Sequence, residues 1–193
     1  MEALDYRSNQ SDKARLGSIG ENMVVAKLMQ KGWDAFNANC NIKNYKSIDV
    51  VCLNSAISES DKHWWKPKTA LVQVKTSVQS NIPTGFSIAE SLDKEYLEKM
   101  VKGPYVFVAA KQETDGYSFR YFIISRKQFI ELLHQAHVFY DKKHNGNEEK
   151  KAPAGISVSW LEGKPEFAPK TPLDFGNPIK ETCENKWENI WEE

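Results

Sequence analysis

A glutamate in the first apolar segment of the chain occupies an inward-facing position, where a carboxylate needs a cation or a hydrogen-bond donor beside it. Residues 13–31 have the periodicity of a helix, and Glu21 precedes Val24, Val25 and Leu28 by three, four and seven positions. This spacing places Glu21 on the inward side of the helix. Burying a carboxylate without a cation or a hydrogen-bond donor costs several kcal/mol. Glu21 is therefore a candidate functional residue.

Two strand-like segments carry three more polar side chains among apolar neighbours. Asp49 lies within Ser47–Leu53 and is followed by four apolar residues, although Asp is disfavoured in strands. In Thr69–Thr76 the period of two turns Gln73 and Lys75 toward one face, with valines between them. Carboxylates, amides and amines are the side chains that bind cations and transfer protons. These positions are candidates for chemistry.

The remaining pattern predicts the elements that position these residues. After the first helix we expect three strands, a helix, two strands and a helix, over residues 33–38, 47–53, 69–76, 89–102, 105–110, 117–125 and 126–137. Ser125 is a candidate N-cap of the last helix. Gly17 and Gly20 weaken the first helix and leave room beside Glu21. The order α-β-β-β-α-β-β-α predicts an α/β fold.

The last quarter of the chain has a different composition. Five of the eight prolines fall in residues 141–193. We expect a core domain over residues 13–140 and an extended Pro- and Trp-rich tail over 141–193 that packs on the core. Aromatic side chains are its predicted anchors: Trp160, Phe167, Phe175, Trp187 and Trp191.

Three short motifs together resemble the PD-(D/E)XK nuclease superfamily. They are Gly-Ser-Ile-Gly-Glu21, Ile-Asp49-Val and Val-Gln73-Val-Lys75. The pattern is most similar to the Holliday-junction-resolvase and Mrr-type restriction branches, in which Gln can replace the acidic residue of the last motif. The resemblance covers roughly residues 13–125. It implies a restriction-endonuclease-like fold, with a mixed central sheet flanked by helices and the core order α-β-β-β-α-β.

The resemblance also implies an activity, a cofactor and residue roles. The activity is metal-dependent endonuclease cleavage of nucleic-acid phosphodiester bonds, with DNA as the expected substrate and Mg²⁺ or Mn²⁺ as the ion. Asp49 is the principal metal ligand, assisted by the Gln73 amide oxygen and the Val74 carbonyl, and Glu21 reaches the ion directly or through a water. Lys75 orients or helps to deprotonate the attacking water and stabilises the charge on phosphate.

The sequence departs from the superfamily pattern at two places. Gln73 stands where most members have an acid, so we expect the metal to bind weakly to the free protein, with Glu21 compensating. The proline that gives the motif its name is absent, and Ser47-Ile48 occupies its place. Related resolvases and restriction enzymes commonly act as dimers, so a homodimer is an open expectation.

Two alternatives assign no catalysis to these residues. In the first, Glu21, Asp49 and Lys75 form a partly buried ion-pair network with a structural role. In the second, the chain is a catalytically degenerate module of the same fold that binds nucleic acid or protein. The sequence leaves both open.

A second group of residues has the composition of a nucleic-acid contact. Lys62, Lys66 and Lys68 are interleaved with Trp64 and Trp65, and basic and aromatic side chains together hold phosphates and stack on bases. The alternative is a surface hairpin whose tryptophans pack on the tail.

The residues after the second motif strand extend this group. Thr76 and Ser77 directly follow Lys75 and are candidate phosphate contacts.

Composition excludes several other classes. The balance of 26 basic against 26 acidic residues excludes a polycation that binds nucleic acid by bulk charge. The three cysteines include no CxxC pair, which argues against a disulfide framework or a thiolate zinc site. No nucleotide-binding glycine motif and no run of eighteen apolar residues occurs. We expect a cytoplasmic protein without a membrane partner.

Overall fold

The computed structural model describes residues 10–38, 48–54, 68–79, 81–87, 92–144, 155–159 and 183–192. Within these ranges the chain is an α/β protein with a mixed central sheet and three α-helices. The elements are α1 (Gln10–Gln30), β1 (Asp34–Asn37), β2 (Val50–Asn54), β3 (Lys68–Ser77), β4 (Asn81–Ser87), α2 (Lys94–Met100), β5 (Tyr105–Glu113), β6 (Gly116–Ile124), α3 (Arg126–His144), β7 (Gly155–Ser159) and the 3-10 helix η5 (Trp187–Trp191).

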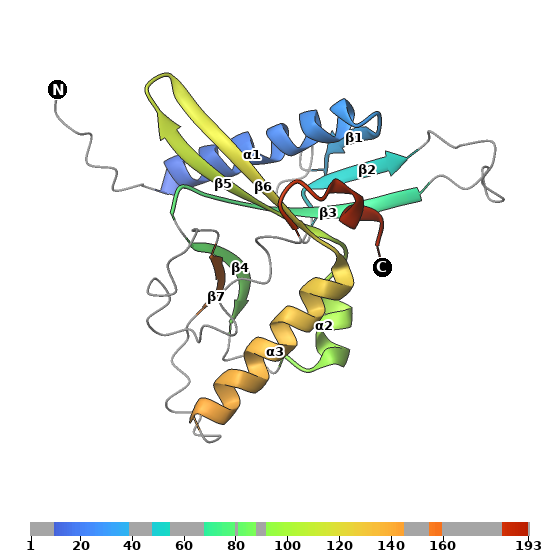
Figure 1. The fold of residues 1–193 in the computed structure, drawn as a ribbon, viewed down its shortest axis with the longest axis vertical. Coiled ribbons are helices and arrows are strands. Elements are labelled where there is room, and N and C mark those ends of the chain that lie inside the picture. Colours follow the sequence, from blue (N-terminus) through green and yellow to red (C-terminus); the bar gives the residue numbers. More distant parts are fainter. Residues whose placement is uncertain are drawn as a thin grey trace.

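The central sheet has the strand order β1-β2-β3-β5-β6 (Figure 1). Its neighbouring strands are antiparallel except for β3 and β5, which run parallel and are connected through β4 and α2. A separate two-stranded sheet joins β4 to β7. The parallel pair needs a long crossover, and β4 and α2 supply it.

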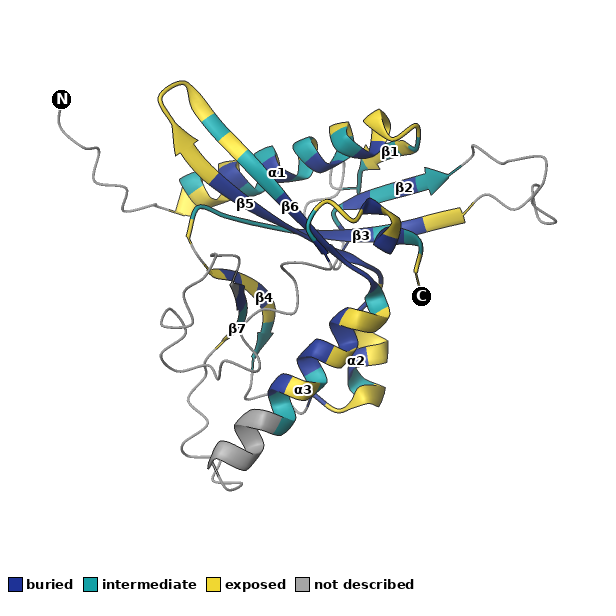
Figure 2. Ribbon diagram, viewed as in Figure 1, coloured by how far each residue is buried: buried dark blue, intermediate teal, exposed yellow. Residues whose placement is uncertain are grey.

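Two apolar clusters hold layers onto opposite faces of the sheet. On one face, Val24 and Leu28 of α1 pack with Val50 and Val72 of the sheet, and Trp187 of η5 belongs to the same cluster. On the other face, α2, α3, β4 and β7 contribute the buried residues (Figures 1 and 2). The sheet is therefore the middle layer of three.

Strand β3 changes partners halfway along its length. Its first half pairs with β2 as far as the register Val50↔Val72, and its second half pairs with β5 from Gln73↔Tyr105 onward. Beyond Val72 the edge of β3 that faced β2 has no strand beside it among the described residues. Three of the candidate residues, Asp49, Gln73 and Val74, meet at this open edge.

Helix α1 approaches β3 closely through Gly20. A Cβ built on Gly20 would lie 1.9 Å from Oγ1 of Thr76, whereas a Cβ on Gly17 would meet nothing within 4 Å. The room predicted beside Glu21 at Gly20 is thus filled by the Thr76 side chain. Helix–strand contact, rather than space for chemistry, explains the glycine at position 20.

Two strands and the bounds of all three helices differ from the sequence prediction. Strands β4 and β7 were not predicted, because Pro83 and Gly85 are poor strand residues and the Pro-rich composition around β7 indicated a tail. Helix α2 begins at Lys94, after Asp93 caps the Tyr96 N–H at 2.8 Å. Residues 88–91, where a helical start was expected, lie outside the described residues.

The N-terminus of α3 confirms the predicted cap. The Ser125 hydroxyl accepts the Gln128 N–H at 3.2 Å, and the Gln128 side chain accepts the Ser125 N–H at 3.1 Å. This reciprocal arrangement is a capping box.

The described end of the chain packs on the core. Glu184 accepts two hydrogen bonds of 2.8 Å from the Arg120 guanidinium, and Asn189 donates to the Ile123 carbonyl at 2.8 Å. Trp191 lies edge-on to Trp33 with 5.1 Å between ring centroids.

No helix in the described ranges is both long and apolar enough to span a membrane.

The Gly20–Thr76 contact predicts opposite effects for two neighbouring substitutions. Gly20→Ala forces α1 away from β3 and should lower the free energy of unfolding by about 1–3 kcal/mol. Gly17→Ala is the matched control and should raise it by roughly 0.5–1 kcal/mol, because Ala favours helix and meets no neighbour. Urea denaturation measures both. Equal effects of the two substitutions would contradict the assigned role of Gly20.

Candidate functional site

The Asp49 carboxylate lies where β2 and β3 separate. The Asp49 N–H donates to the Val72 carbonyl at 3.0 Å, next to the last registered pair of the two strands. The carboxylate then accepts the Val74 N–H at 2.8 Å and a hydrogen bond from the Gln73 amide nitrogen, both on Oδ2. The Asp49 carboxylate thus accepts the hydrogen bond that a backbone carbonyl of β2 would accept if β2 continued along β3.

The backbone of Val74 faces the same open edge. The Gln73 N–H donates to the Pro104 carbonyl at 3.0 Å and is directed toward β5. Successive residues of a strand direct their polar groups to opposite edges, and the N–H and C=O of one residue share an edge. The Val74 carbonyl therefore points to the edge where its N–H meets Asp49.

Lys75 extends over β4. Alternation puts it on the face of β3 that also carries Gln73, away from α1. A Cβ built on Gly85, whose φ is +92°, would lie 3.8 Å from Nζ of Lys75. Within the described part of the chain, Lys75 forms no ion pair with Glu21 or Asp49. Its ammonium group is not part of the structural ion-pair network considered above.

Glu21 reaches the same end of the sheet from the α1 side. Its Oε2 accepts a hydrogen bond of 3.0 Å from the Asn37 amide. Asn37 is registered with Val50, and the next residue, Ala38, donates its N–H to the Asp49 carbonyl at 2.8 Å. The structure thus brings Asp49, Gln73 and Val74 into direct contact and places Glu21 of α1 against the end of the neighbouring strand β1.

Tyr105 lies beside the site on β5 and was not predicted from the sequence. It is registered with Gln73 and is 4% exposed. Burial, and then the negative charge of Asp49, raise the pKa of the Tyr105 hydroxyl well above its ordinary value. The electrostatic effect of Asp49 therefore extends to β5.

The donor set of this edge fits a hard divalent cation. Such ions prefer carboxylate and carbonyl oxygens, and the edge offers the Asp49 carboxylate, the Val74 carbonyl and the Gln73 amide. Gln73 turns its amide nitrogen toward Asp49, so rotation of the amide is needed to present its oxygen to a cation bound there. Among the described residues no group of three or more His, Cys, Asp or Glu side chains could hold a metal ion, so an ion at this edge would have one carboxylate ligand and would be held weakly.

The predicted nucleic-acid contacts have different outcomes. Lys62, Trp64, Trp65 and Lys66 lie outside the described residues. Lys68 is exposed at the start of β3, paired with β2, and is remote from the open edge.

The two predicted phosphate contacts after Lys75 point to different neighbours. Thr76 packs against Gly20, and its buried Oγ1 has no hydrogen-bond partner in the described structure. The Ser77 hydroxyl accepts the Gln79 N–H at 2.9 Å and lines a pocket.

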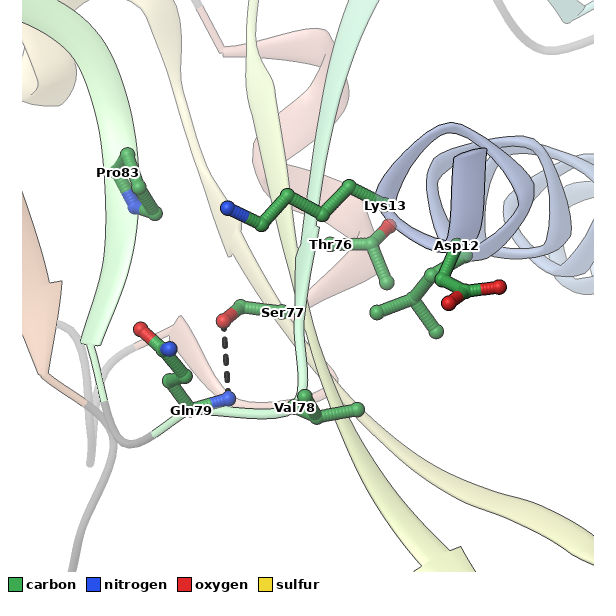
Figure 3. A pocket seen from close by; sticks show the side chains of 8 residues that line it. Asp12, Lys13, Thr76, Ser77, Val78, Gln79 and Pro83 are labelled. Atoms are coloured by element: carbon green, nitrogen blue, oxygen red, sulfur yellow. Dashed lines mark hydrogen bonds between the residues drawn. The ribbon is translucent and has the colours of Figure 1, made fainter. Parts of the chain in front are cut away.

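This pocket of about 210 Å³ lies at the end of the open edge (Figure 3). Lys13 of α1, Gln79 after β3 and Pro83 of β4 line it together with Ser77. The sequence prediction did not include Lys13 or Pro83, because these two residues belong to α1 and β4 and not to the segment around β3. Only the approach of α1 and β4 to the end of β3 brings them together.

The environment of Tyr105 predicts a pH dependence of stability. The pKa of Tyr105 is raised in the folded state. Its contribution to the free energy of unfolding is therefore fully present below the ordinary tyrosine pKa of about 10 and is lost as the pH rises above that value. Tyr105→Phe removes this loss. Urea denaturation between pH 8 and 11 should show the wild type losing up to about 1.4 kcal/mol per pH unit relative to the variant above pH 10. Parallel curves would contradict the assignment.

Comparison with known proteins adds no relative: no protein-family model, no curated protein and no solved structure matches the chain. Function is therefore inferred from the open edge of β3 and the residues that meet there.

Proposed function

We propose that the chain is a metal-dependent endonuclease of the PD-(D/E)XK superfamily that hydrolyses DNA phosphodiester bonds. The observation that carries this proposal is the junction of β2 and β3. There the Asp49 carboxylate accepts hydrogen bonds from Gln73 and the Val74 N–H, and Lys75 follows on the same strand face as Gln73. Asp49 and Gln73 meet at one strand edge, and Lys75 lies on the adjoining face of the strand, beside β4.

The arrangement of elements supports a restriction-endonuclease-like fold without reproducing the expected order in full. Helix α1 precedes the antiparallel strands β1, β2 and β3, and β5 then pairs with β3 in parallel. Strand β4 is an addition between β3 and α2. It covers the face that carries Lys75 and so forms one wall beside the proposed site.

The residues have separable roles in the proposed reaction. Mg²⁺, when bound, neutralises charge on the phosphate and supplies an activated water. Asp49 and the Val74 carbonyl would hold the ion, with Gln73 contributing after its amide rotates and Glu21 approaching from α1. Lys75 positions the water for attack and stabilises the negative charge that develops on the phosphate oxygens.

A specific observation favours one alternative, a catalytically degenerate module that binds nucleic acid. The Gln73 amide nitrogen already satisfies Oδ2 of Asp49, an oxygen that a cation would otherwise use. Salt-dependent DNA binding that survives Asp49→Ala and Lys75→Ala, without cleavage by any form of the protein, would establish this alternative.

Cleavage of nucleic acid by the purified chain tests the proposal. We expect phosphodiester hydrolysis with Mg²⁺ or Mn²⁺ in a panel of branched, duplex and single-stranded DNA and of RNA. Asp49→Asn and Lys75→Met should each lower the rate by about 10²-fold or more, because they remove a ligand and a charge that stabilises the transition state.

Matched controls come from the β5–β6 hairpin. Asp115→Asn and Lys111→Met make the same chemical changes at exposed positions and should leave the rate unchanged. Absence of cleavage by the wild type on every substrate, with both ions, would refute the proposed activity.

The substitution Gln73→Glu should make the thermal stability of the protein depend more strongly on Mg²⁺. The substitution replaces a hydrogen bond to Asp49 with two adjacent carboxylates, so the metal-free protein should be less stable than the wild type. Mg²⁺ should then bind roughly tenfold more tightly or better and raise the Tm more than it does for the wild type.

Thermal unfolding with EDTA and with increasing Mg²⁺ measures this effect. Gln112→Glu, at an exposed position of β5, is the control. An equal response of the two variants to Mg²⁺ would show that position 73 is not at a metal site.

A further inference from the structure

The pocket at the end of β3 lies along the edge that carries the proposed active site. Residues 73–77 of β3 pair with β5 on one side, and Asp49 meets the opposite edge at Val74. The pocket begins at Thr76 and Ser77, two to three residues further along, which is about 7–10 Å in a strand. A nucleic-acid strand that follows this edge would pass both places.

The pocket walls come from three elements. Asp12, Lys13 and Leu16 belong to α1, Ser77, Val78 and Gln79 to the end of β3 and the turn after it, and Pro83 to β4. Figure 3 shows the Lys13 side chain extending from α1 across the pocket toward Pro83. The pocket therefore lies between the layers on the two faces of the sheet, at the end of β3, and is open to solvent.

The pocket lining combines aliphatic side chains with side chains that donate and accept hydrogen bonds. Leu16, Val78 and Pro83 provide aliphatic surface, and Ser77 and Gln79 provide hydrogen-bonding groups. A nucleobase has apolar faces and a polar edge, and so matches such a lining.

Two charged groups complete the lining. Lys13 supplies a cation suited to phosphate, whereas the charge of Asp12 is partly balanced by Arg15 at 3.8 Å. A carboxylate is also an acceptor for the amino groups of bases. A nucleotide can place its phosphate at Lys13 and the amino group of its base at Asp12, whereas a bare phosphate would leave the aliphatic walls uncovered.

The size of the pocket limits the ligand to one unit. Its volume of about 210 Å³ is smaller than the roughly 300–1,000 Å³ of sites for drug-sized molecules. A single nucleotide is the largest repeating piece of nucleic acid that such a space can take.

We propose that this pocket binds one unpaired nucleotide of the substrate strand next to the bond that is cut. This proposal rests on the proposed nuclease function and names its substrate class. A base inside a continuous duplex must first be unpaired and unstacked, at a cost of a few kcal/mol. The enzyme should therefore prefer strands that already have an unpaired nucleotide, as in single-stranded, gapped or branched DNA.

Binding of mononucleotides without metal tests the pocket separately from catalysis. In EDTA, deoxyadenosine and thymidine 5′-monophosphates should bind the wild type more tightly than thymidine or inorganic phosphate does, as measured by calorimetry. Lys13→Ala should weaken the binding of the mononucleotides by roughly tenfold, and Lys13→Arg should retain it. Lys31→Ala, at an exposed lysine just beyond the other end of α1, is the matched control and should bind as the wild type does.

The outcomes separate the two proposals. Equal affinity for inorganic phosphate and mononucleotide, or no effect of Lys13→Ala, would overturn the nucleotide pocket even if the protein cleaves DNA. Mononucleotide binding that depends on Lys13, in a protein that cleaves nothing, would support the pocket and overturn the nuclease function. Equal cleavage of continuous duplex and gapped DNA would overturn the assigned substrate class.

Discussion

The Val74 N–H needs an acceptor because β2 leaves β3 one residue after Val72. A buried or partly buried peptide N–H without an acceptor costs about as much as a lost hydrogen bond. Asp49 meets this need with its carboxylate at 2.8 Å, and the same oxygen accepts from Gln73. One carboxylate therefore connects the end of β2 to the second half of β3. It also sets the negative charge that Tyr105 experiences on β5.

The separation of the two strands is stabilised by packing on both faces of β3. The first half of β3 pairs with β2 and the second with β5, so no single partner spans the strand. Gly20 lets α1 lie directly on Thr76, and on the other face the left-handed backbone of Gly85, with φ of +92°, lies at ordinary contact distance from the Lys75 side chain. Between these two layers, the edge of β3 beyond Val72 has no strand beside it among the described residues. The proposed function therefore relies on the same interruption of the sheet that the packing of α1 and β4 on β3 stabilises.

Local patterns predicted most of the elements but missed those that form through distant contacts. The apolar periodicity of residues 13–31 matches α1, and the buried run after Pro104 matches β5. Strands β4 and β7 escaped prediction because their residues have little intrinsic strand preference and are stabilised by pairing with each other across more than 65 positions of sequence. The Thr84 hydroxyl, fully buried and bonded to the Ile156 carbonyl at 2.7 Å, contributes to this pairing.

The sequence by itself determined the residue types and faces of the candidate site. Alternation along one strand is enough to place Gln73 and Lys75 on the same face, and Asp49 stands out because its neighbours are apolar. Tertiary structure decided which partners these groups meet. The Asn37 contact of Glu21, the burial of Thr76 on Gly20 and the pocket at Lys13 each join elements whose relative position follows from layer packing. Such packing depends on the fit of side chains distant in sequence, which periodicity and propensity do not encode.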